Sequence, residues 1–98
     1  MEGKWTITLT GSAYRHDFTR LDALAAISRA RLAADPFEPS RITGASDPAG
    51  WIGPAVDGTD IEVFAEVDHR ARTIAIFHIM EARPHVIRTI EKAQKERE

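Results

Sequence analysis

The segment from Thr59 to Asp68 constrains the fold more than any other part of the chain, because apolar and polar residues alternate along it. Successive side chains of a strand point to opposite faces, so this alternation predicts a strand with one face in the core. The predicted core face carries Ile61, Val63, Ala65 and Val67. The Asp57-Gly58 pair just before it is typical of a two-residue hairpin turn, which would join this strand to Trp51–Val56.

A two-residue turn also determines which residues of the hairpin lie opposite one another. It places Ile52 opposite Val63 and Trp51 opposite Phe64. Proline cannot donate to a strand ladder, so Pro54 predicts that the first strand of the hairpin lies at a sheet edge or beside a bulge.

The next strand, Thr73–Met80, is apolar on both faces, which is typical of a central strand. Symmetric closure of this second hairpin sets Phe64 opposite Phe77 and leaves His78 on the aliphatic face. Trp51, Phe64 and Phe77 would then form an aromatic row on the other face. A bulge would instead move His78 to the aromatic face, and the sequence leaves both registers open.

Two segments carry helical signals. Residues 18–33 place apolar residues on one helical face, and Thr19 with Asp22 resembles a capping box at the start of that helix. Pro84 suits the first turn of a second helix with a thin apolar stripe. The charged residues 91–98 predict a frayed end.

With the period-2 segment Trp5–Leu9 as a first strand, the predicted order is β-α-β-β-β-α. This is an α+β fold with a small antiparallel sheet, the first strand added at an edge and the first helix packed on one face. A chain of 98 residues builds one modest core, so we expect a single domain over 1–98 with its core at about 5–90.

The chain has no cysteine, no apolar run approaching the ~18 residues of a membrane span and no signal-like start. We therefore expect a cytoplasmic protein without membrane contact. The four histidines have spacings that match no standard zinc pattern, so neither a metal nor another cofactor is expected. These histidines are His16, His69, His78 and His85.

Charge is distributed unevenly behind a net value of −2. Residues 35–68 hold one basic and eight acidic side chains, whereas residues 69–98 hold seven basic and four acidic ones. Contacts to RNA would therefore be confined to the basic ends of the chain, where the candidates are Arg15, Arg88 and Lys92.

Three motifs resemble those of BrnT-like toxins, members of the RelE-type superfamily of bacterial type II toxin–antitoxin modules. They are Ser12-Ala13-Tyr14-Arg15-His16-Asp17 before the first helix, the hairpin segments Trp51–Gly58 and Ile61–Val63, and the strand Ile76–Met80 followed by Glu81-Ala82-Arg83. The resemblance covers roughly residues 5 to 87 and implies a RelE-like fold. It also implies a metal-independent endoribonuclease that cleaves messenger RNA, often on the ribosome, and is neutralised by a cognate antitoxin.

The resemblance also suggests roles for individual residues. Arg83 matches the arginine that follows the last strand in such toxins, and would stabilise the phosphate during cleavage. His16 matches a basic-His step that reads Lys-His-Gly in BrnT-like chains, with Asp17 here in place of the glycine. His78 and Glu81 are the acid–base groups available near Arg83.

Each of these residues also has a structural interpretation. His78 could be a hydrogen-bonded histidine of the sheet, and Arg83 could pair with a neighbouring carboxylate. Trp51, Phe64 and Phe77 could stack bases, pack under the second helix, or bind an antitoxin or a second copy of the chain. The alternative to a ribonuclease is therefore a non-catalytic protein-interaction or dimerisation domain on the same scaffold.

Overall fold

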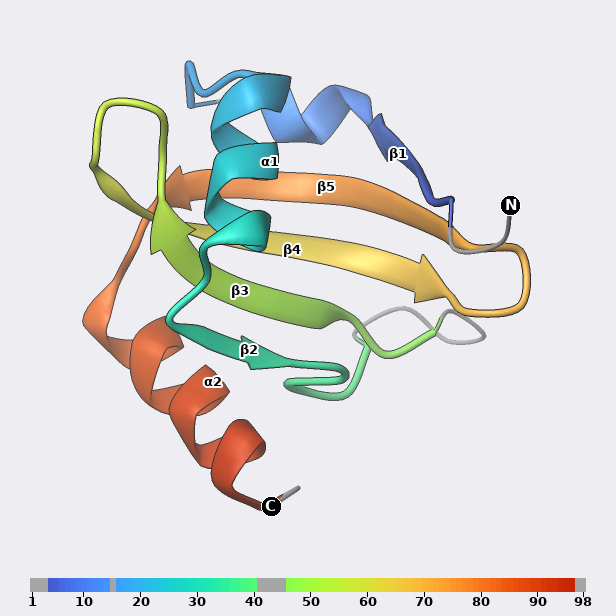
Figure 1. Ribbon diagram of the computed structural model, residues 1–98. Coiled ribbons are helices and arrows are strands. Elements are labelled where there is room, and N and C mark those ends of the chain that lie inside the picture. The colour runs from blue at the N-terminus through green and yellow to red at the C-terminus, as the bar shows by residue number, and fades with distance from the viewer. Residues whose placement is uncertain (1–3, 15, 41–45, 97–98) are drawn as a thin grey trace.

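A mixed β-sheet with strand order β1-β5-β4-β3-β2 forms the centre of the computed structural model, which describes residues 4–14, 16–40 and 46–96 (Figure 1). β1 runs parallel to β5, and the other neighbouring strands are antiparallel. The strands are β1 (Thr6–Leu9), β2 (Leu32–Ala34), β3 (Ala49–Pro54), β4 (Asp60–Asp68) and β5 (Thr73–Glu81). The helices are the 3-10 helix η1 (Gly11–Tyr14), α1 (Arg20–Ser28) and α2 (Pro84–Glu96). The predicted α+β class is confirmed, with β1 at an edge and β5 in the interior, but the predicted antiparallel sheet is wrong, because β1 runs parallel to β5 and makes the sheet mixed.

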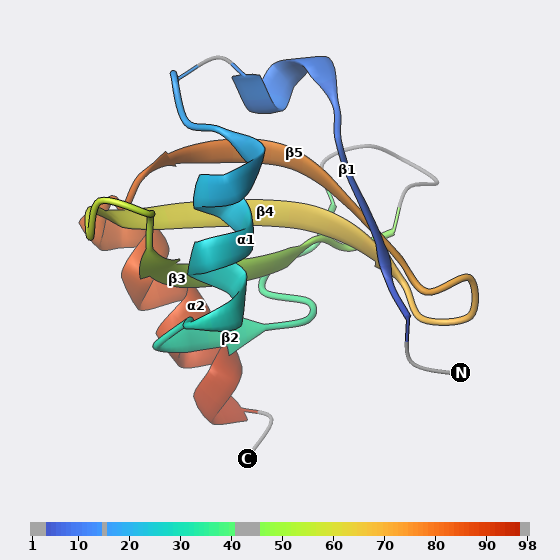
Figure 2. The same ribbon diagram turned by 45° about the horizontal axis from the view of Figure 1, so that its top comes forward.

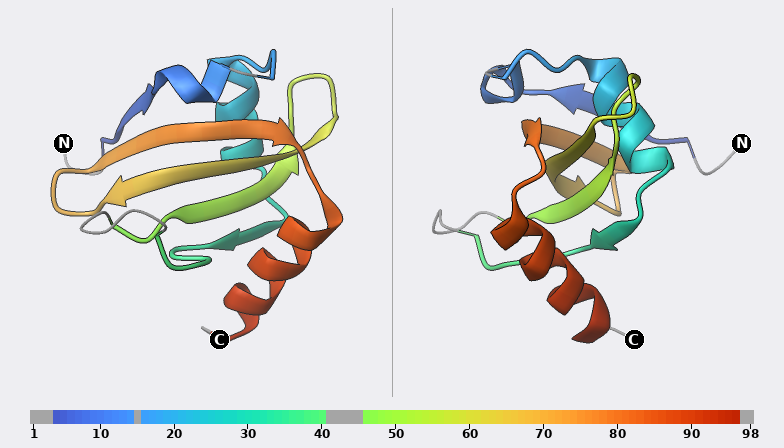
Figure 3. Two further views of the ribbon diagram at one scale, coloured as in Figure 1. Left: turned by 180° about the vertical axis from the view of Figure 1, so that it is seen from behind. Right: turned by 90° about the vertical axis from the view of Figure 1, so that its left-hand side faces the viewer.

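The two faces of the sheet are covered differently. Ile61 and Val63 on β4 are fully buried beneath α1, so the predicted core face is confirmed. On the opposite face Ile52 and Phe64 pack with the apolar stripe of α2. Figures 2 and 3 show that α1 crosses the middle of the sheet, whereas α2 lies along its β2 side. The second face is therefore covered only in part.

Helix α1 begins as predicted, since Thr19 and Asp22 form a reciprocal capping box. It ends at Ser28, however, and not near residue 33, because Leu32 belongs to β2. β2 was not predicted, and its pairing with β3 makes β3 an interior strand. The edge position inferred from Pro54 is therefore wrong. Pro54 is the last residue of β3, beyond the pairing with β2, where no ladder bond from its nitrogen is needed.

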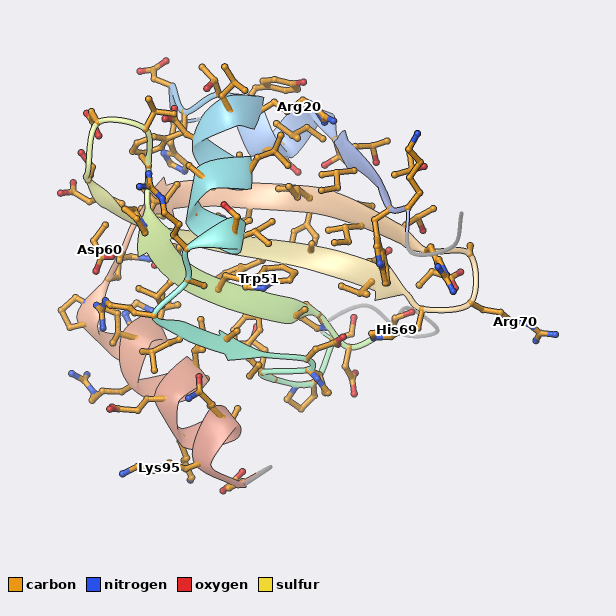
Figure 4. The ribbon with its side chains drawn as sticks, in the orientation of Figure 1. Arg20, Trp51, Asp60, His69, Arg70 and Lys95 are labelled. Atoms are coloured by element: carbon orange, nitrogen blue, oxygen red, sulfur yellow. The ribbon has the colours of Figure 1, made fainter. Side chains whose placement is uncertain are left out.

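The turn between β3 and β4 has three residues, not two, which shifts the predicted register by one residue. The Ala55 amide donates to the Thr59 carbonyl at 2.7 Å, and Gly58 takes the positive φ (93°) that closes such a loop. Trp51 consequently lies opposite Val63, on the α1 face, and packs against the core there (Figure 4). The predicted aromatic row is wrong in this respect, because it loses Trp51.

The hairpin between β4 and β5 contains the bulge that the sequence left open. Near the turn the predicted pairing holds, from Asp68 opposite Thr73 to Ala65 opposite Ile76. The register then shifts, so that His78 lies opposite Phe64 and Phe77 is the additional residue. His78 therefore lies on the face of Phe64, away from α1.

Both outer strands have an edge group bonded by a side chain. Gln94 of α2 accepts a hydrogen bond from the Ala33 amide of β2 at 2.8 Å, and Arg20 of α1 donates to the Ile7 carbonyl of β1 at 2.7 Å. Such contacts hinder pairing with another chain. Gln94 lies in α2, which stays helical to Glu96, whereas the sequence predicted a frayed end over residues 91–98. Among the described residues, no helix is long and apolar enough to cross a bilayer.

A close approach of α1 to β3 generates the first prediction. A Cβ at Gly53 would overlap the backbone carbonyl of Ala26, whereas a Cβ at Gly11 would meet open space. Because a backbone carbonyl cannot move aside as a side chain can, we expect Gly53→Ala to lower the free energy of unfolding by about 2 kcal/mol. We expect Gly11→Ala to change it by less than about 0.5 kcal/mol. Urea unfolding of both variants measures the difference, and equal stabilities would contradict the packing described here.

Candidate functional site

The sheet face that carries α2 is hollowed by a cavity of about 870 Å³. Strands β4 and β5 form its floor, and the left panel of Figure 3 views the molecule from this side. Described residues from segments far apart in the sequence form its walls, namely from 10–14 with 16, from 37–40, from 46–48 and from the first turns of α2. The cavity lining includes Ser12, His16, Phe37, Glu38, Phe64, Glu66, Phe77, His78 and Arg83.

Glu62, on β4 beside this cavity, is the fully buried charged residue around which the site is built. Its Oε1 accepts from the Arg83 amide at 2.9 Å. Its Oε2 accepts from Arg83 Nε at 3.1 Å, from Arg83 Nη2 at 2.5 Å and from His78 Nε2 at 2.8 Å. Both carboxylate oxygens are therefore satisfied, as a buried charge requires.

These bonds determine the protonation state of the carboxyl group. Burial raises the pKa of Glu62, but hydrogen bonds from His78 and Arg83 together outweigh burial and hold the pKa below its ordinary value of 4.5. The same contact raises the pKa of the Arg83 guanidinium, against the opposing effect of its burial. The site therefore contains an ionised carboxylate and a charged guanidinium at neutral pH.

The position of Arg83 follows from the chain on either side of it. β5 ends at Glu81, and the Ala82 amide donates to the Asp60 carbonyl at 3.0 Å. Pro84 starts α2 and disfavours helical backbone at the residue before it. The Arg83 side chain remains 40% exposed, and with Nε and Nη2 bound to Glu62 its Nη1 is the nitrogen left for an anionic ligand.

His78 is held on two sides. Its ring stacks on Phe64, with centroids 4.3 Å apart and planes 16° from parallel, while its Nε2 contacts Glu62. A carboxylate only accepts hydrogen bonds, so Nε2 carries the proton in this contact. In the neutral ring Nδ1 is then the acceptor, available to a ligand.

His16 lies next to His78, although 62 residues separate them in the sequence. The two ring centroids are 6.2 Å apart and the rings meet edge to face. His16 is exposed and lines the cavity, in a turn where Asp17 adopts φ 66°. This is the left-handed conformation that glycine adopts freely and that Asp tolerates. Asp17 therefore adopts the backbone conformation that a glycine at this position would adopt freely.

Some of the other residues predicted for the site line the cavity, and the rest lie outside it. Glu81 lies opposite Ile61, so it shares the α1 face of the sheet and does not line the cavity. Arg88 and Lys92 are exposed on α2, also outside the cavity lining. Arg15 lies outside the described residues. Phe64 and Phe77 line the cavity, whereas Trp51 lies on the other face.

His69 takes no part in the site either. Its Nε2 bonds Asp35 at 2.7 Å, near the turn from which Arg70 projects into solvent (Figure 4). Across the described ranges, no three His, Cys, Asp or Glu side chains gather as a metal site would require.

Glu62 is a site residue that was not predicted from the sequence. It lies in the polar half of an alternating strand, which predicted an exposed side chain. One signal could have corrected this: β5 is apolar on both faces, so the second face of the sheet is also covered. Phe37 and Ser12 were missed too, and for these no local pattern pointed to the cavity. Phe37 packs on Phe64, and the Ser12 hydroxyl donates to the Phe77 carbonyl at 2.8 Å.

The lowered pKa of Glu62 predicts a specific acid sensitivity. Folding favours the ionised form, so its contribution to stability is complete above the unfolded-state pKa, near 4.5, and is lost as pH falls through the lower folded-state pKa. We expect Glu62→Gln to cost about 2–3 kcal/mol at pH 7 and to flatten the decline in stability below pH ~4.5. Urea unfolding between pH 3 and pH 7 measures both effects.

Asp22 provides the control for that measurement. Backbone amides of Thr19 and Val56 also lower its pKa, so it contributes an acid dependence of the same sign at a distant site. Asp22→Asn should leave the Glu62 component in place, and the effects of the two substitutions should add. An acid profile unchanged by Glu62→Gln would show that the carboxylate is not held as described.

Comparison of the chain with models of protein families, with curated proteins and with solved structures finds no match. Functional inference therefore depends on the geometry of this site and on the motifs in the sequence.

Proposed function

We propose that this chain is the toxin of a bacterial type II toxin–antitoxin module, a metal-independent endoribonuclease that cleaves messenger RNA and is neutralised by a cognate antitoxin. The observation that supports it is the convergence of His16, His78 and Arg83 on one cavity, where His78 and Arg83 share the buried carboxylate of Glu62 and His16 contacts His78. Cleavage of RNA without a metal needs a proton acceptor, a proton donor and a cation at the phosphate. These three residues supply one of each.

The proposed reaction is an attack of the ribose 2′-oxygen on the adjacent phosphorus. His78 takes the proton of the 2′-hydroxyl at Nδ1, because its Nε2–H is bound to Glu62. His16, in its protonated form, gives a proton to the departing 5′-oxygen. The phosphorus–5′-oxygen bond breaks as the new bond forms, leaving a 2′,3′-cyclic phosphate and a free 5′-hydroxyl.

Arg83 and Glu62 have separate roles in this scheme. The guanidinium contacts the phosphate through Nη1 and stabilises the negative charge of the phosphorane. Glu62 does not touch the substrate and is a positioning residue, since it holds the His78 ring and the Arg83 fork in place. It also compensates the charge of Arg83. One protonated histidine is what the proposed reaction requires.

The toxin assignment extends this chemistry with the resemblance to BrnT-like chains. The α+β fold with its sheet and two helices is compatible with a RelE-like scaffold. We propose that the chain acts in the cytoplasm and that the antitoxin inhibits it by covering the cavity. Glu81, Arg88 and Lys92 are left out of the proposed catalytic site because they do not line that cavity.

Substitutions in the purified protein test the chemistry. We expect His78→Ala, His16→Ala and Arg83→Ala each to slow cleavage of a single-stranded RNA by about 10²–10⁴-fold, the usual contribution of such groups. His69→Ala and Arg70→Ala remove the same residue types far from the cavity and should retain the wild-type rate. Gel analysis of labelled RNA with excess chelator present measures the rates and identifies the cyclic phosphate. Wild-type protein that leaves RNA intact would overturn the proposal.

Expression in bacteria tests the biological role. We expect induced wild-type protein to arrest growth and degrade messenger RNA, and Arg83→Ala and His78→Ala to abolish both effects at equal protein levels. A small neighbouring gene whose co-expression restores growth would identify the antitoxin. Growth and transcripts that stay normal with soluble wild-type protein would contradict the toxin assignment, whereas toxicity that survives both substitutions would contradict only the assigned residues.

A further inference from the structure

We infer that the cavity selects guanine among the bases, with Glu66 and Glu38 reading its Watson–Crick edge and Phe77 stacking on its ring. This inference rests on the proposed function, since it names the nucleotide that the same cavity would hold. It uses three residues that have no part in the proposed cleavage chemistry.

The cavity is electrically polarised along β4. At one end lie Arg83, His78 and His16, whereas Glu66 lies on the same face farther along the strand. The Glu66–Ala75 pair is two residues of β4 from the Phe64–His78 pair, or about 7 Å. A ligand that fits both ends has an anionic group at one end and hydrogen-bond donors at the other. A nucleotide has this polarity when its base presents donors.

Phe77 provides a flat surface between the two ends. It is the additional residue of the β5 bulge, between the pairs formed by Ala75 and His78, and it is only partly buried. Its ring lies 6.3 Å from that of Phe64, at an angle of 59°, so it is not stacked on that neighbour. Phe64, by contrast, already packs against His78 and Phe37. An exposed aromatic ring on a sheet is a surface on which a base stacks.

The two carboxylates are free to accept hydrogen bonds from a ligand. Across the described parts of the chain, Glu66 and Glu38 form no hydrogen bond or ion pair, although both line the cavity. They come from separate segments, Glu66 from β4 and Glu38 from the stretch after β2. Phe37, the residue before Glu38, packs its ring on Phe64 with centroids 4.6 Å apart, and both Glu38 and Glu66 line the same cavity.

An ionised carboxylate discriminates among bases because it only accepts hydrogen bonds. Guanine offers two adjacent donors, N1–H and the 2-amino group, which a carboxylate can accept together. Adenine and cytosine place an acceptor nitrogen next to their amino group, and uracil flanks its single N–H with two carbonyls. These acceptors would face a carboxylate oxygen. Guanine is therefore the base whose edge matches this wall.

Binding of mononucleotides tests selection separately from cleavage. Isothermal titration of the whole chain with 3′-GMP, 3′-AMP, 3′-CMP and 3′-UMP measures affinity for ligands that cannot be cleaved, and 5′-GMP shows which phosphate position fits. We expect 3′-GMP to bind at least about tenfold more tightly than the other three bases. Glu66→Gln and Glu38→Gln should each reduce that preference, and Phe77→Leu should weaken all four nucleotides. Glu91→Gln, an exposed change on α2 outside the cavity, should alter neither.

The outcomes distinguish this inference from the proposed function. Equal affinity for the four bases, or a guanine preference that survives the combined Glu66→Gln and Glu38→Gln substitutions, would overturn the inference. RNA that is cleaved without base preference would do the same while leaving the ribonuclease proposal intact. A chain that prefers guanine nucleotides but cleaves no RNA would keep the base site and overturn the catalytic proposal. Circular dichroism of each variant shows that the fold is retained.

Discussion

The site depends on the hydrogen bonds that the buried carboxylate of Glu62 accepts from His78 and Arg83. Removing a carboxylate from water is unfavourable by several kcal/mol, and only good geometry with full hydrogen bonding compensates for it. Here the partners come from β5 and from the residue that precedes α2, so the bonds of one side chain join β4, β5 and the start of α2. Because the buried carboxylate needs these hydrogen bonds, they also hold His78 and Arg83 in one arrangement.

The bulge in β5 is the second constraint, and it determines which side chains meet this carboxylate. In a regular hairpin with the register found near its turn, His78 would lie on the α1 face among Ile61, Val63 and Ile76. On that face the ring nitrogens of His78 would be buried without the hydrogen bond that Oε2 of Glu62 accepts from Nε2. The shift between Phe64 and Ala65 places His78 and Phe77 on the cavity side together. Bulges occur often beside functional sites because they redirect a side chain in this way.

Most of the fold could be predicted from the sequence, and the errors in that prediction have physical causes. The alternation of β4 and the capping box of α1 are local patterns, and both were confirmed. The Asp57-Gly58 pair is compatible with loops of two and of three residues, so it could not determine the register that moved Trp51. β2 has three residues and is stabilised by its contacts with β3 and Gln94, which no local pattern reveals.

The candidate site was less predictable, for the same reason. Arg83, His78 and His16 were identified from the sequence, but Glu62, the partner that Arg83 and His78 share, was not, because its burial depends on a cover made by distant segments. Glu81 was chosen for its closeness to Arg83 in sequence, and strand alternation places it on the other face. Glu81 is three residues from His78 in β5, and strand residues separated by an odd number of positions point to opposite faces unless a bulge intervenes.

An acidic chain that binds RNA needs a local explanation, and the charges of the cavity supply one. A chain with a net charge of −2 repels a polyanion at long range, so RNA binding cannot depend on the field of the whole molecule. At the site, Glu62 binds Nε and Nη2 of Arg83 and leaves Nη1 for a phosphate, while Glu66 lies two residues farther along β4 than Phe64, or about 7 Å. The guanidinium and the Glu66 carboxylate thus lie at different ends of the cavity, so a phosphate can meet Arg83 without meeting Glu66. Under the proposed mechanism this local separation of charge, and not the net charge of the chain, determines how the ligand lies.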